Sequence, residues 1–344
     1  MTRVSVFAGE FGLEAAEEIC SGGQISSYGI LNLISSLVDK SLIQVEETSG
    51  EARFRLLETV RAFARDKLTH SKEAAEVRNR HLDYYVALSE RAGQEMRDRG
   101  FANVTEAVGG EQTLGQVLAS ADFSPLSVQV DLDVQGRGFA DWFDRLSAET
   151  DNLRAAMDWA LASGQADKHL QISGSLLIFW NHRGLFNEMH VSMEAALATA
   201  SEPPVRAKAL ATASGLSVMA GHFRLAAERA KECVDLSREL GDETSLAYGL
   251  SYWGWSQFWM GEGGLDKVKE AQRTAQAIEE WRLLGISFFF RTLMEAYLNN
   301  ARSARPFLDA AITGIRMSRE PFSLAVATYW GAGIYMLLGE LAEA

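Results

Sequence analysis

Gly221-His222-Phe223 is a short turn between two apolar stretches, and the chain repeats its pattern at Gly184-Leu185-Phe186 and at Gly339-Glu340-Leu341. Two more turns, at Gly261 and Asn300, lie between Gly221 and Gly339. Successive turns are therefore 37, 40, 39 and 39 residues apart. A period of this length predicts stacked pairs of helices, because each pair buries its apolar face only against its neighbours.

The apolar spacing between these turns predicts where the paired helices lie. The expected pairs are 205–219 with 223–240, 243–260 with 264–280, and 284–298 with 303–318, followed by an unpaired helix at 322–337. We interpret residues 201–344 as tetratricopeptide-like repeats, truncated at the C-terminus. Residues 139–200 are expected to form a helical linker into the first repeat, with helices at 167–181 and 186–200. An open apolar face at Ala344 would favour self-association.

Residues 1–71 show a different order of elements. Helical spacing at 11–21 and 27–40 is followed by two strand-like segments around a turn at 48–51, and then by a helix from Glu58. The expected core positions of the last two helices are Ile30, Leu33, Ile34, Leu37, Val60, Phe63, Ala64 and Leu68. The predicted fold is thus mainly α: a winged-helix-like N-terminal domain with a small β-hairpin, followed by a tetratricopeptide-like α-solenoid.

Two segments lie between these parts. Residues 72–97 are expected to form a linker helix, because apolar and aromatic side chains recur there at helical spacing. That stripe consists of Val77, His81, Tyr84, Tyr85 and Leu88. Residues 98–138 are interpreted as a flexible insertion with one strand-like stretch. Asp131 and Asp133 in that stretch could bind a cation, but solvent-facing strand positions are the favoured interpretation.

The composition is that of an ordinary globular chain. Its 344 residues are 47% apolar, carry a net charge of −13 and include two widely separated cysteines, Cys20 and Cys233. These cysteines form no disulfide framework, and no stretch has the roughly 18–20 apolar residues that span a membrane. The absence of a basic segment argues against binding to nucleic-acid phosphates. We therefore expect a cytoplasmic protein with no membrane contact.

Several motifs resemble those of one bacterial family, and they occur along this chain in the same order as in that family. They include Leu37-Val-Asp-Lys-Ser-Leu42, Arg53-Phe-Arg-Leu-Leu-Glu-Thr-Val-Arg61, Arg80-His-Leu-Asp-Tyr-Tyr85 and Asp151-Asn-Leu-Arg-Ala-Ala156. The chain is similar to the winged-helix and tetratricopeptide portion of STAND-class (NB-ARC-like) ATPases, and to LuxR- or AfsR-type transcriptional regulators. The resemblance implies an ATPase domain in cis that binds ATP or ADP. Gly109–Gly115 lacks the lysine of a phosphate-binding loop, so no cofactor is expected in this chain.

The resemblance also implies an interdomain relay at Leu57, Glu58 and Arg61. In related families a histidine at the position of Leu57 reaches the bound diphosphate, and in the resembling ATPases the winged domain packs on the nucleotide domain. Leu57 cannot make that contact. Glu58 is interpreted as a carboxylate at a helix start, where the helix dipole favours it.

Aromatic residues gather on the expected first helices of the repeats. The candidate ligand or partner surface consists of Tyr252, Trp253, Trp255, Trp259, Tyr297 and Trp330. First helices line the inner surface of tetratricopeptide arrays, so some of these rings could contact a ligand. Packing in the helix–helix core is the alternative for each ring. The three tryptophans of the 243–260 helix cannot all face inward.

Three functions are compatible with the sequence. The favoured one is a non-catalytic sensor and scaffold part of a signalling ATPase-type transcriptional regulator, which binds a protein or small-molecule effector on its repeats and relays that state through the winged helix. The second is a DNA-binding winged-helix transcription factor. Direct DNA binding is not expected, because the presumptive recognition helix 27–40 ends in Asp39-Lys40 and the wing contains Glu46 and Glu47. The remote alternative is an enzyme, for which the six scattered histidines offer no site.

Overall fold

The computed structural model describes residues 1–48, 51–98, 141–200, 202–299, 301–318 and 321–338. The chain folds into two compact units. The first contains Met1–Arg91 and Phe143–Ile172, and the second contains Ala92–Trp142 and Ser173–Ala344. Residues 99–138 of the predicted insertion at 98–138 lie outside the described residues, as do the turns at Asn300 and Gly339.

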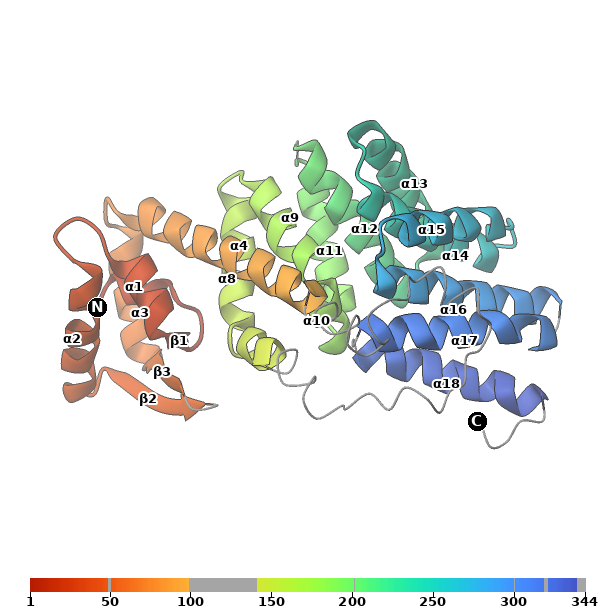
Figure 1. Cartoon of the computed structure of the whole chain (residues 1–344). Coiled ribbons are helices and arrows are strands. Elements are labelled where there is room, and N and C mark those ends of the chain that lie inside the picture. Colours follow the sequence, from red (N-terminus) through yellow and green to blue (C-terminus); the bar gives the residue numbers. More distant parts are fainter. Residues whose placement is uncertain (49–50, 99–140, 201, 300, 319–320, 339–344) are drawn as a thin grey trace. The chain divides into compact units, whose positions relative to one another are not determined.

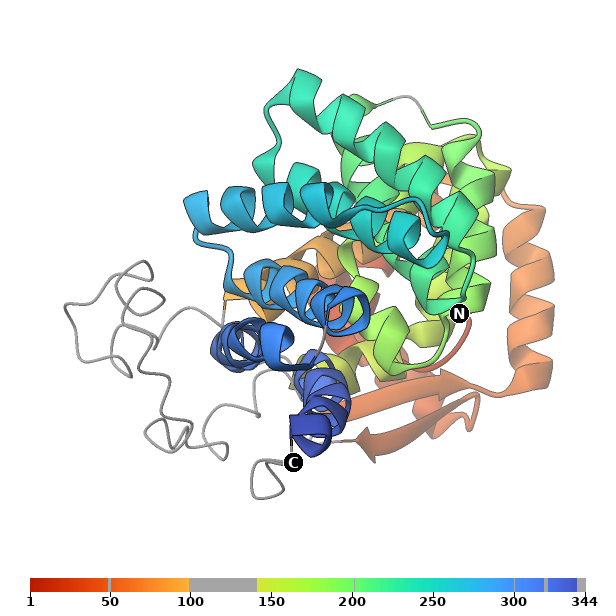
Figure 2. The same cartoon turned by 90° about the vertical axis from the view of Figure 1, so that its right-hand side faces the viewer.

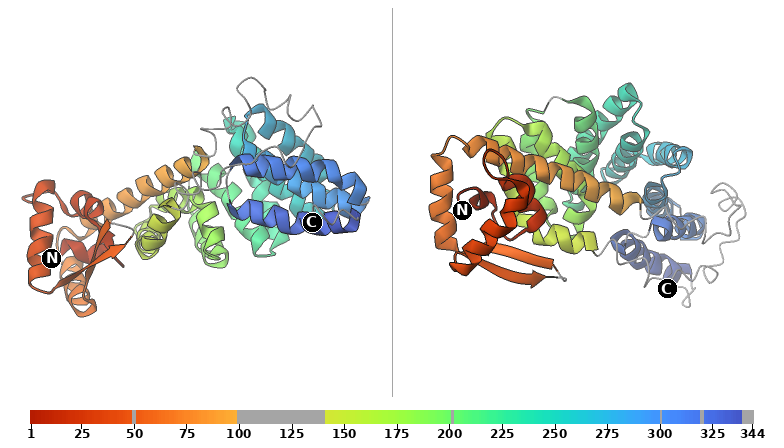
Figure 3. Two further views of the ribbon diagram at one scale, coloured as in Figure 1. Left: turned by 60° about the horizontal axis from the view of Figure 1, so that its bottom comes forward. Right: turned by 60° about the vertical axis from the view of Figure 1, so that its left-hand side comes forward.

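The first unit begins with a winged-helix order of elements (Figure 1). Its elements are η1 (Arg3–Val6), β1 (Phe11–Gly12), α1 (Leu13–Cys20), α2 (Ser27–Asp39), β2 (Ile43–Thr48), β3 (Glu51–Leu56) and α3 (Glu58–Thr69). The strands form an antiparallel sheet in the order β1-β3-β2. The hairpin of β2 and β3 is visible as two arrows in Figure 3. Phe11 pairs with Phe54, and Ile43 pairs with Leu56. This arrangement confirms the predicted winged helix and adds β1, a two-residue strand too short to show a period.

Two expected core positions of the winged helix are wrong. Leu33 in α2 is 49% exposed and Phe63 in α3 is 56% exposed. Each helix buries a narrow stripe instead, with Ile30 and Ile34 inside on α2, and Ala64 and Leu68 inside on α3. A sequence pattern locates an apolar face, but the width of the neighbouring surface decides how much of it is covered.

The first unit is completed by helices from beyond the winged-helix segment. They are the first part of α4 (Ala74–Asp98), helical residues 143–148, α8 (Thr150–Ala162) and the first part of α9 (Ala166–Ser175). The predicted α4 stripe is buried at Val77, His81, Tyr85 and Leu88. His81 lies between the rings of Phe7 and Tyr85, at centroid distances of 5.7 and 4.7 Å. An aromatic cluster therefore joins α4 to the N-terminal segment.

The second unit is an array of paired helices (Figures 1 and 2). They are α10 (Leu177–His182), α11 (Phe186–Leu197), α12 (Pro203–Met219), α13 (Phe223–Leu240), α14 (Glu243–Trp259), α15 (Leu265–Ala277), α16 (Trp281–Leu298), α17 (Ala301–Ser318) and α18 (Pro321–Leu338). The predicted pairs from 205 onward are confirmed. The single helix predicted at 167–181 is wrong, because it breaks at Leu176 between α9 and α10. The indole nitrogen of Trp180 donates to the carbonyl of Ser173, 3.0 Å away, across that break.

The repeated glycine turns have one shared geometry. At Gly221, φ is +77°, the Gly221 amide donates to Val218 O and the His222 amide donates to Ser217 O. These two hydrogen bonds close the end of α12 in a Schellman motif, which needs a left-handed residue. Gly184 and Gly261 repeat the same pair of bonds. Glu279 occupies the equivalent place after α15 with φ +55°, a conformation unfavourable for a residue with a Cβ atom.

Substitutions at these turns should change stability in opposite directions. Glu279→Gly should raise the free energy of unfolding by about 0.5–1 kcal/mol, and Gly221→Ala should lower it by about 1 kcal/mol. A Cβ at Gly221 would meet no atom within 4 Å, so the effect reports the backbone alone. Urea unfolding followed by circular dichroism measures both. Gly333→Ala, within α18 and equally unobstructed, is the matched control and should stabilise the chain.

Candidate functional site

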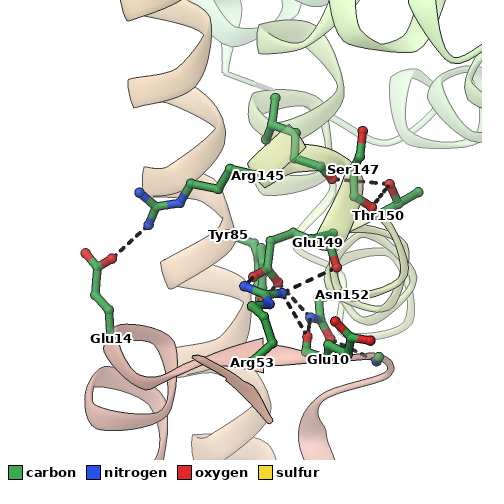
Figure 4. A network of polar contacts seen from close by, with 12 residues as sticks. Glu10, Glu14, Arg53, Tyr85, Arg145, Ser147, Glu149, Thr150 and Asn152 are labelled. Carbon is green, nitrogen blue, oxygen red and sulfur yellow. Dashed lines mark hydrogen bonds and ion pairs between the residues drawn. The ribbon is translucent and has the colours of Figure 1, made fainter. Parts of the chain in front are cut away.

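A buried polar network holds the winged-helix elements against the helices that follow them (Figure 4). Its four side chains come from β3, α4 and the start of α8, and they are Arg53, Tyr85, Glu149 and Asn152. Arg53 and Glu149 form an ion pair of 2.6 Å in which both side chains are less than 10% exposed. Tyr85 and Asn152 donate to the other carboxylate oxygen of Glu149, at 2.5 and 2.7 Å. Glu149 is therefore neutralised and hydrogen-bonded on both oxygens.

Asn152 extends the network to the N-terminal backbone. Its Oδ1 accepts from the amides of Ala8 and Gly9 at 2.8 and 3.3 Å, and its Nδ2 donates to Glu10 O at 2.7 Å. Arg53 Nη2 also approaches Glu10 O, at 3.4 Å. The segment from Ala8 to Glu10 leads directly into β1, so this one amide side chain fixes the first strand of the sheet to α8.

The electrostatics of the network keep Tyr85 protonated. Burial and the neighbouring Glu149 carboxylate raise the pKa of Tyr85 well above its ordinary value. Its hydroxyl therefore remains a donor to Glu149. Such a set can bind and orient, and it has no open position for a reacting group. It is a structural connection between elements that are far apart in sequence.

The predicted relay residues lie beside this network. Leu57 immediately precedes α3, and Glu58 pairs with Arg61 at 2.7 Å while remaining 74% exposed on its side chain. Arg61 also donates to the carbonyl of Ala8. Arg61 and Asn152 thus hold the same backbone segment from two sides, whereas Leu57 and Glu58 do not reach the network in the contacts described.

Sequence reasoning missed the four network residues. Arg53, Tyr85 and Asn152 each lie in a motif that carries the family resemblance, and Glu149 lies two residues before one of those motifs. The sequence does contain one signal that could have identified these residues. It is a polar residue that lies within such a motif and on a stripe of otherwise apolar positions. The nearby pair Arg145–Glu14, at 2.7 Å, is largely solvent-exposed and is expected to stabilise much less.

A pocket of about 440 Å³ lies within the second unit. It is lined by the N-terminal parts of α10, α12, α14 and α16, together with the ends of α4 and α9. Its charged side chains are Lys208, Asp242, Glu280 and Arg282. Lys208 donates to the hydroxyl of Ser175 at 3.0 Å. Arg282 donates to the hydroxyl of Tyr248 and lies 5.2 Å from the centre of its ring.

The predicted aromatic surface divides between core and surface positions. Tyr252 and Trp255 are 6% and 8% exposed, because Tyr252 packs against Gly215 and Trp255 stacks on Phe290 at 4.6 Å. These two side chains serve the packing between repeats rather than an open surface. Trp253 is partly buried, with the Lys267 ammonium 4.7 Å from its ring centre. The rings that are at least half exposed are Trp259, Tyr297 and Trp330.

The residues that the structure describes contain no group of three or more His, Cys, Asp or Glu side chains that could hold a metal ion. None of the helices described there is both long enough and apolar enough to cross a membrane.

Comparison with known proteins identifies the N-terminal part. Residues 1–69 match the family model described as a winged helix-turn-helix domain. The chain therefore begins with a winged helix-turn-helix domain. That assignment agrees with the observed order of helices and strands and with the predicted resemblance.

Curated relatives extend the similarity beyond this domain. Proteins of Mycobacterium tuberculosis and Mycobacterium bovis, named as HTH-type transcriptional regulators, are 30% identical over 298 residues. These alignments cover 83% of this chain and 29% of each relative, so the chain spans less than a third of their length. An uncharacterized M. tuberculosis protein is 39% identical over 80 residues, which cover 23% of this chain and 20% of that protein.

One solved structure can be aligned with this chain, and the alignment covers 97% of this chain and 53% of the chain in that structure. It is a STAND protein with a tetratricopeptide repeat sensor from Pyrococcus horikoshii, 17% identical, with a TM-score of 0.38. At that score the likeness supports no argument about function.

Removing one partner of the buried ion pair should strongly destabilise the first unit. Glu149→Gln leaves the Arg53 charge buried without its counter-charge, and a loss of about 3–5 kcal/mol in the free energy of unfolding is expected. Arg53→Met together with Glu149→Gln removes the buried charge and keeps an oxygen that accepts from Tyr85 and Asn152, so it should recover much of that loss. Glu14→Gln, in the exposed pair with Arg145, is the control and should cost less than about 1 kcal/mol. Equal losses for the two single carboxylate variants would contradict the assigned role of the network.

The buried imidazole of His81 should make the first unit sensitive to acid. Burial lowers the pKa of His81 to about 3, whereas an unfolded histidine titrates near 6.5. As the pH falls, the unfolded chain therefore binds this proton before the folded chain does. The contribution of neutral His81 to the free energy of unfolding is fully present above pH 6.5. It is lost as the pH falls towards 3, by up to about 1.4 kcal/mol per pH unit. His81→Phe should flatten that slope in unfolding experiments across this range. His70→Phe, at an exposed site, should leave it unchanged.

Proposed function

We propose that this chain is a non-catalytic regulatory part of a transcriptional regulator. In this proposal the helical-repeat unit binds an effector or a partner protein, and the winged helix with its attached helices relays the bound state. The names of the mycobacterial relatives support the regulatory role, and the winged helix-turn-helix match supports the relay position. An ATPase domain in cis, with its ATP or ADP, follows from the family resemblance.

The observation that carries the proposal is the sharing of two helices by both units. Helix α4 contributes Tyr85 to the buried network and Met96 to the pocket. Helix α9 contributes residues up to Ile172 to the first unit, and Gly174 and Ser175 to the pocket. A ligand that favours one arrangement of these helix ends can shift the population of states in the network, provided that it binds the two states with different affinities.

Hydrogen–deuterium exchange of the whole chain tests the relay. Compounds or partner proteins that raise the unfolding temperature are added, and exchange is compared at the pocket helices and at Ala8–Glu10 with α8. The proposal expects protection at the pocket together with a changed exchange rate at Ala8–Glu10. Asn152→Ala should uncouple the two responses, whereas Arg154→Ala, in a pair that is partly exposed, should not. Binding that changes the repeats alone would reject the relay.

DNA binding is a second candidate function, against the expectation from the sequence. The match to a winged helix-turn-helix domain favours it, and so does the open face of α2, where Tyr28 is 93% exposed and Asn32 is also exposed. The wing counts against it, because Glu46 and Glu47 of β2 are both exposed and carboxylates repel phosphates.

Fluorescence anisotropy with labelled duplexes at several salt concentrations tests this candidate. A DNA-binding domain should give an affinity that falls as salt rises, and Tyr28→Ala with Asn32→Ala should weaken it. Thr59→Ala, exposed on α3, is the control for a general loss of structure. The absence of any anisotropy change at low salt would remove DNA binding as a function of this chain.

A further inference from the structure

Two of the six histidines come together in the second unit, although they are far apart in the sequence. His190 lies in α11, and His222 is the residue that directly precedes α13. Their ring centres are 5.3 Å apart, and the ring planes are inclined by 59°. Helix α12 packs against both α11 and α13, so the pair lies where two successive repeats meet (Figure 1).

Ser217, near the end of α12, orients both histidines. Its carbonyl oxygen accepts from the His222 amide at 2.8 Å. Its hydroxyl oxygen lies 2.7 Å from Ala213 O and 3.1 Å from His190 Nδ1. Because Ala213 O can only accept, the single hydroxyl proton is donated there, and His190 Nδ1 donates to the hydroxyl oxygen. The neutral imidazole of His190 is thus held with its proton on Nδ1 and a lone pair on Nε2.

The lone pair of His190 Nε2 is available to a ligand. His190 as a whole is only 7% exposed, yet its Nε2 has no hydrogen-bond partner among the described residues and still reaches solvent. His222 is exposed, and its ring nitrogens have no hydrogen-bond partner in the part of the chain that the structure describes. An imidazole that one nitrogen orients through a hydrogen bond, with the other nitrogen open, is the usual state of a metal-binding histidine.

The spacing of the two rings suits a shared metal ion. Zinc binds imidazole nitrogens at about 2.0–2.1 Å in tetrahedral geometry, which places the centres of two ligating rings about 5 Å apart. The separation of 5.3 Å between His190 and His222 agrees with this value. Their inclination also shows that the rings are not stacked face to face.

The charged side chains near the pair balance one another. Glu194, one turn after His190 in α11, accepts from Arg229 with both carboxylate oxygens. Arg229 also pairs with Glu232, which in turn pairs with Arg206. Two cations and two anions are therefore matched, so this group does not repel a dication as a lone arginine would. Glu194 is held by Arg229 and is not counted as a ligand.

We propose that His190 Nε2 and a ring nitrogen of His222 together bind a late first-row transition-metal dication, such as zinc, with water in its remaining coordination positions. Imidazole suits zinc, nickel and copper, whereas magnesium and calcium prefer oxygen ligands. Bound metal connects α11 to the turn between α12 and α13, and so stiffens the junction of two repeats. Neither histidine lines the pocket, so the inference goes beyond the proposed function and is independent of it.

Isothermal titration calorimetry of the untagged full chain with zinc and with magnesium tests the site, at about pH 7.5, where an ordinary histidine is neutral. One zinc ion per chain with a Kd of about 100 μM or tighter is expected. Zinc should also raise the unfolding temperature, because it binds the folded state. Magnesium should bind at least about tenfold more weakly. The absence of saturable zinc binding, or equal binding of magnesium, would overturn the proposal.

Variants locate the metal, and their unfolding temperatures without metal verify the fold. His190→Asn keeps a donor near Ser217 and removes Nε2, while His222→Ala removes the exposed ligand, so each should weaken zinc binding at least about tenfold. Ser217→Ala removes the orienting hydrogen bond and should weaken it by about tenfold. His70→Ala, at an exposed histidine in the other unit, is the matched control and should leave the affinity unchanged. His222→Ala decides the question if the buried variants fail to fold, and full zinc affinity in that variant would reject the site.

Discussion

The buried contact between Arg53 and Glu149 is the constraint on which the first unit depends. Two charges removed from water cost several kcal/mol each, and their attraction offsets this only when the remaining donors and acceptors are also satisfied. Tyr85 and Asn152 supply those contacts to Glu149. One placement of β3, α4 and α8 satisfies the whole set, so the network selects a single arrangement of these elements more than it adds net stability.

This arrangement makes the winged helix part of a larger body. The family match ends at residue 69, yet the charge of Arg53 and the amides of Ala8 and Gly9 find their partners near residue 150. The aromatic contacts of His81 with Phe7 and Tyr85 reinforce the same connection. A domain defined by sequence similarity and a unit defined by packing therefore differ here by four helical segments, which are the first part of α4, residues 143–148, α8 and the first part of α9.

Much of the fold could be predicted because its signals are local. Helical periods located the repeat pairs, and glycines such as Gly221 marked turns that require a left-handed residue. The winged-helix order followed from a change of period near residue 42. The break at Leu176 could not be predicted, since it depends on the indole of Trp180 reaching Ser173. The network and the pocket were missed for a related reason, because their members come from separate elements and leave no periodic pattern. The surface available to each aromatic ring, as for Trp255, is likewise decided by its neighbours in the next repeat.

The division of the first unit along the chain has a consequence for its biosynthesis. Arg53 precedes Glu149 by 96 residues, and residues 92–142 of the other unit intervene. A ribosome makes the chain from its N-terminus, so the winged-helix strands emerge well before the carboxylate that neutralises Arg53. Until α8 has followed, the guanidinium must remain in water and β1 lacks the amide that holds its leading segment. The closing of this unit must thus wait until residues 143–172 have been made, although most of its residues are made before them.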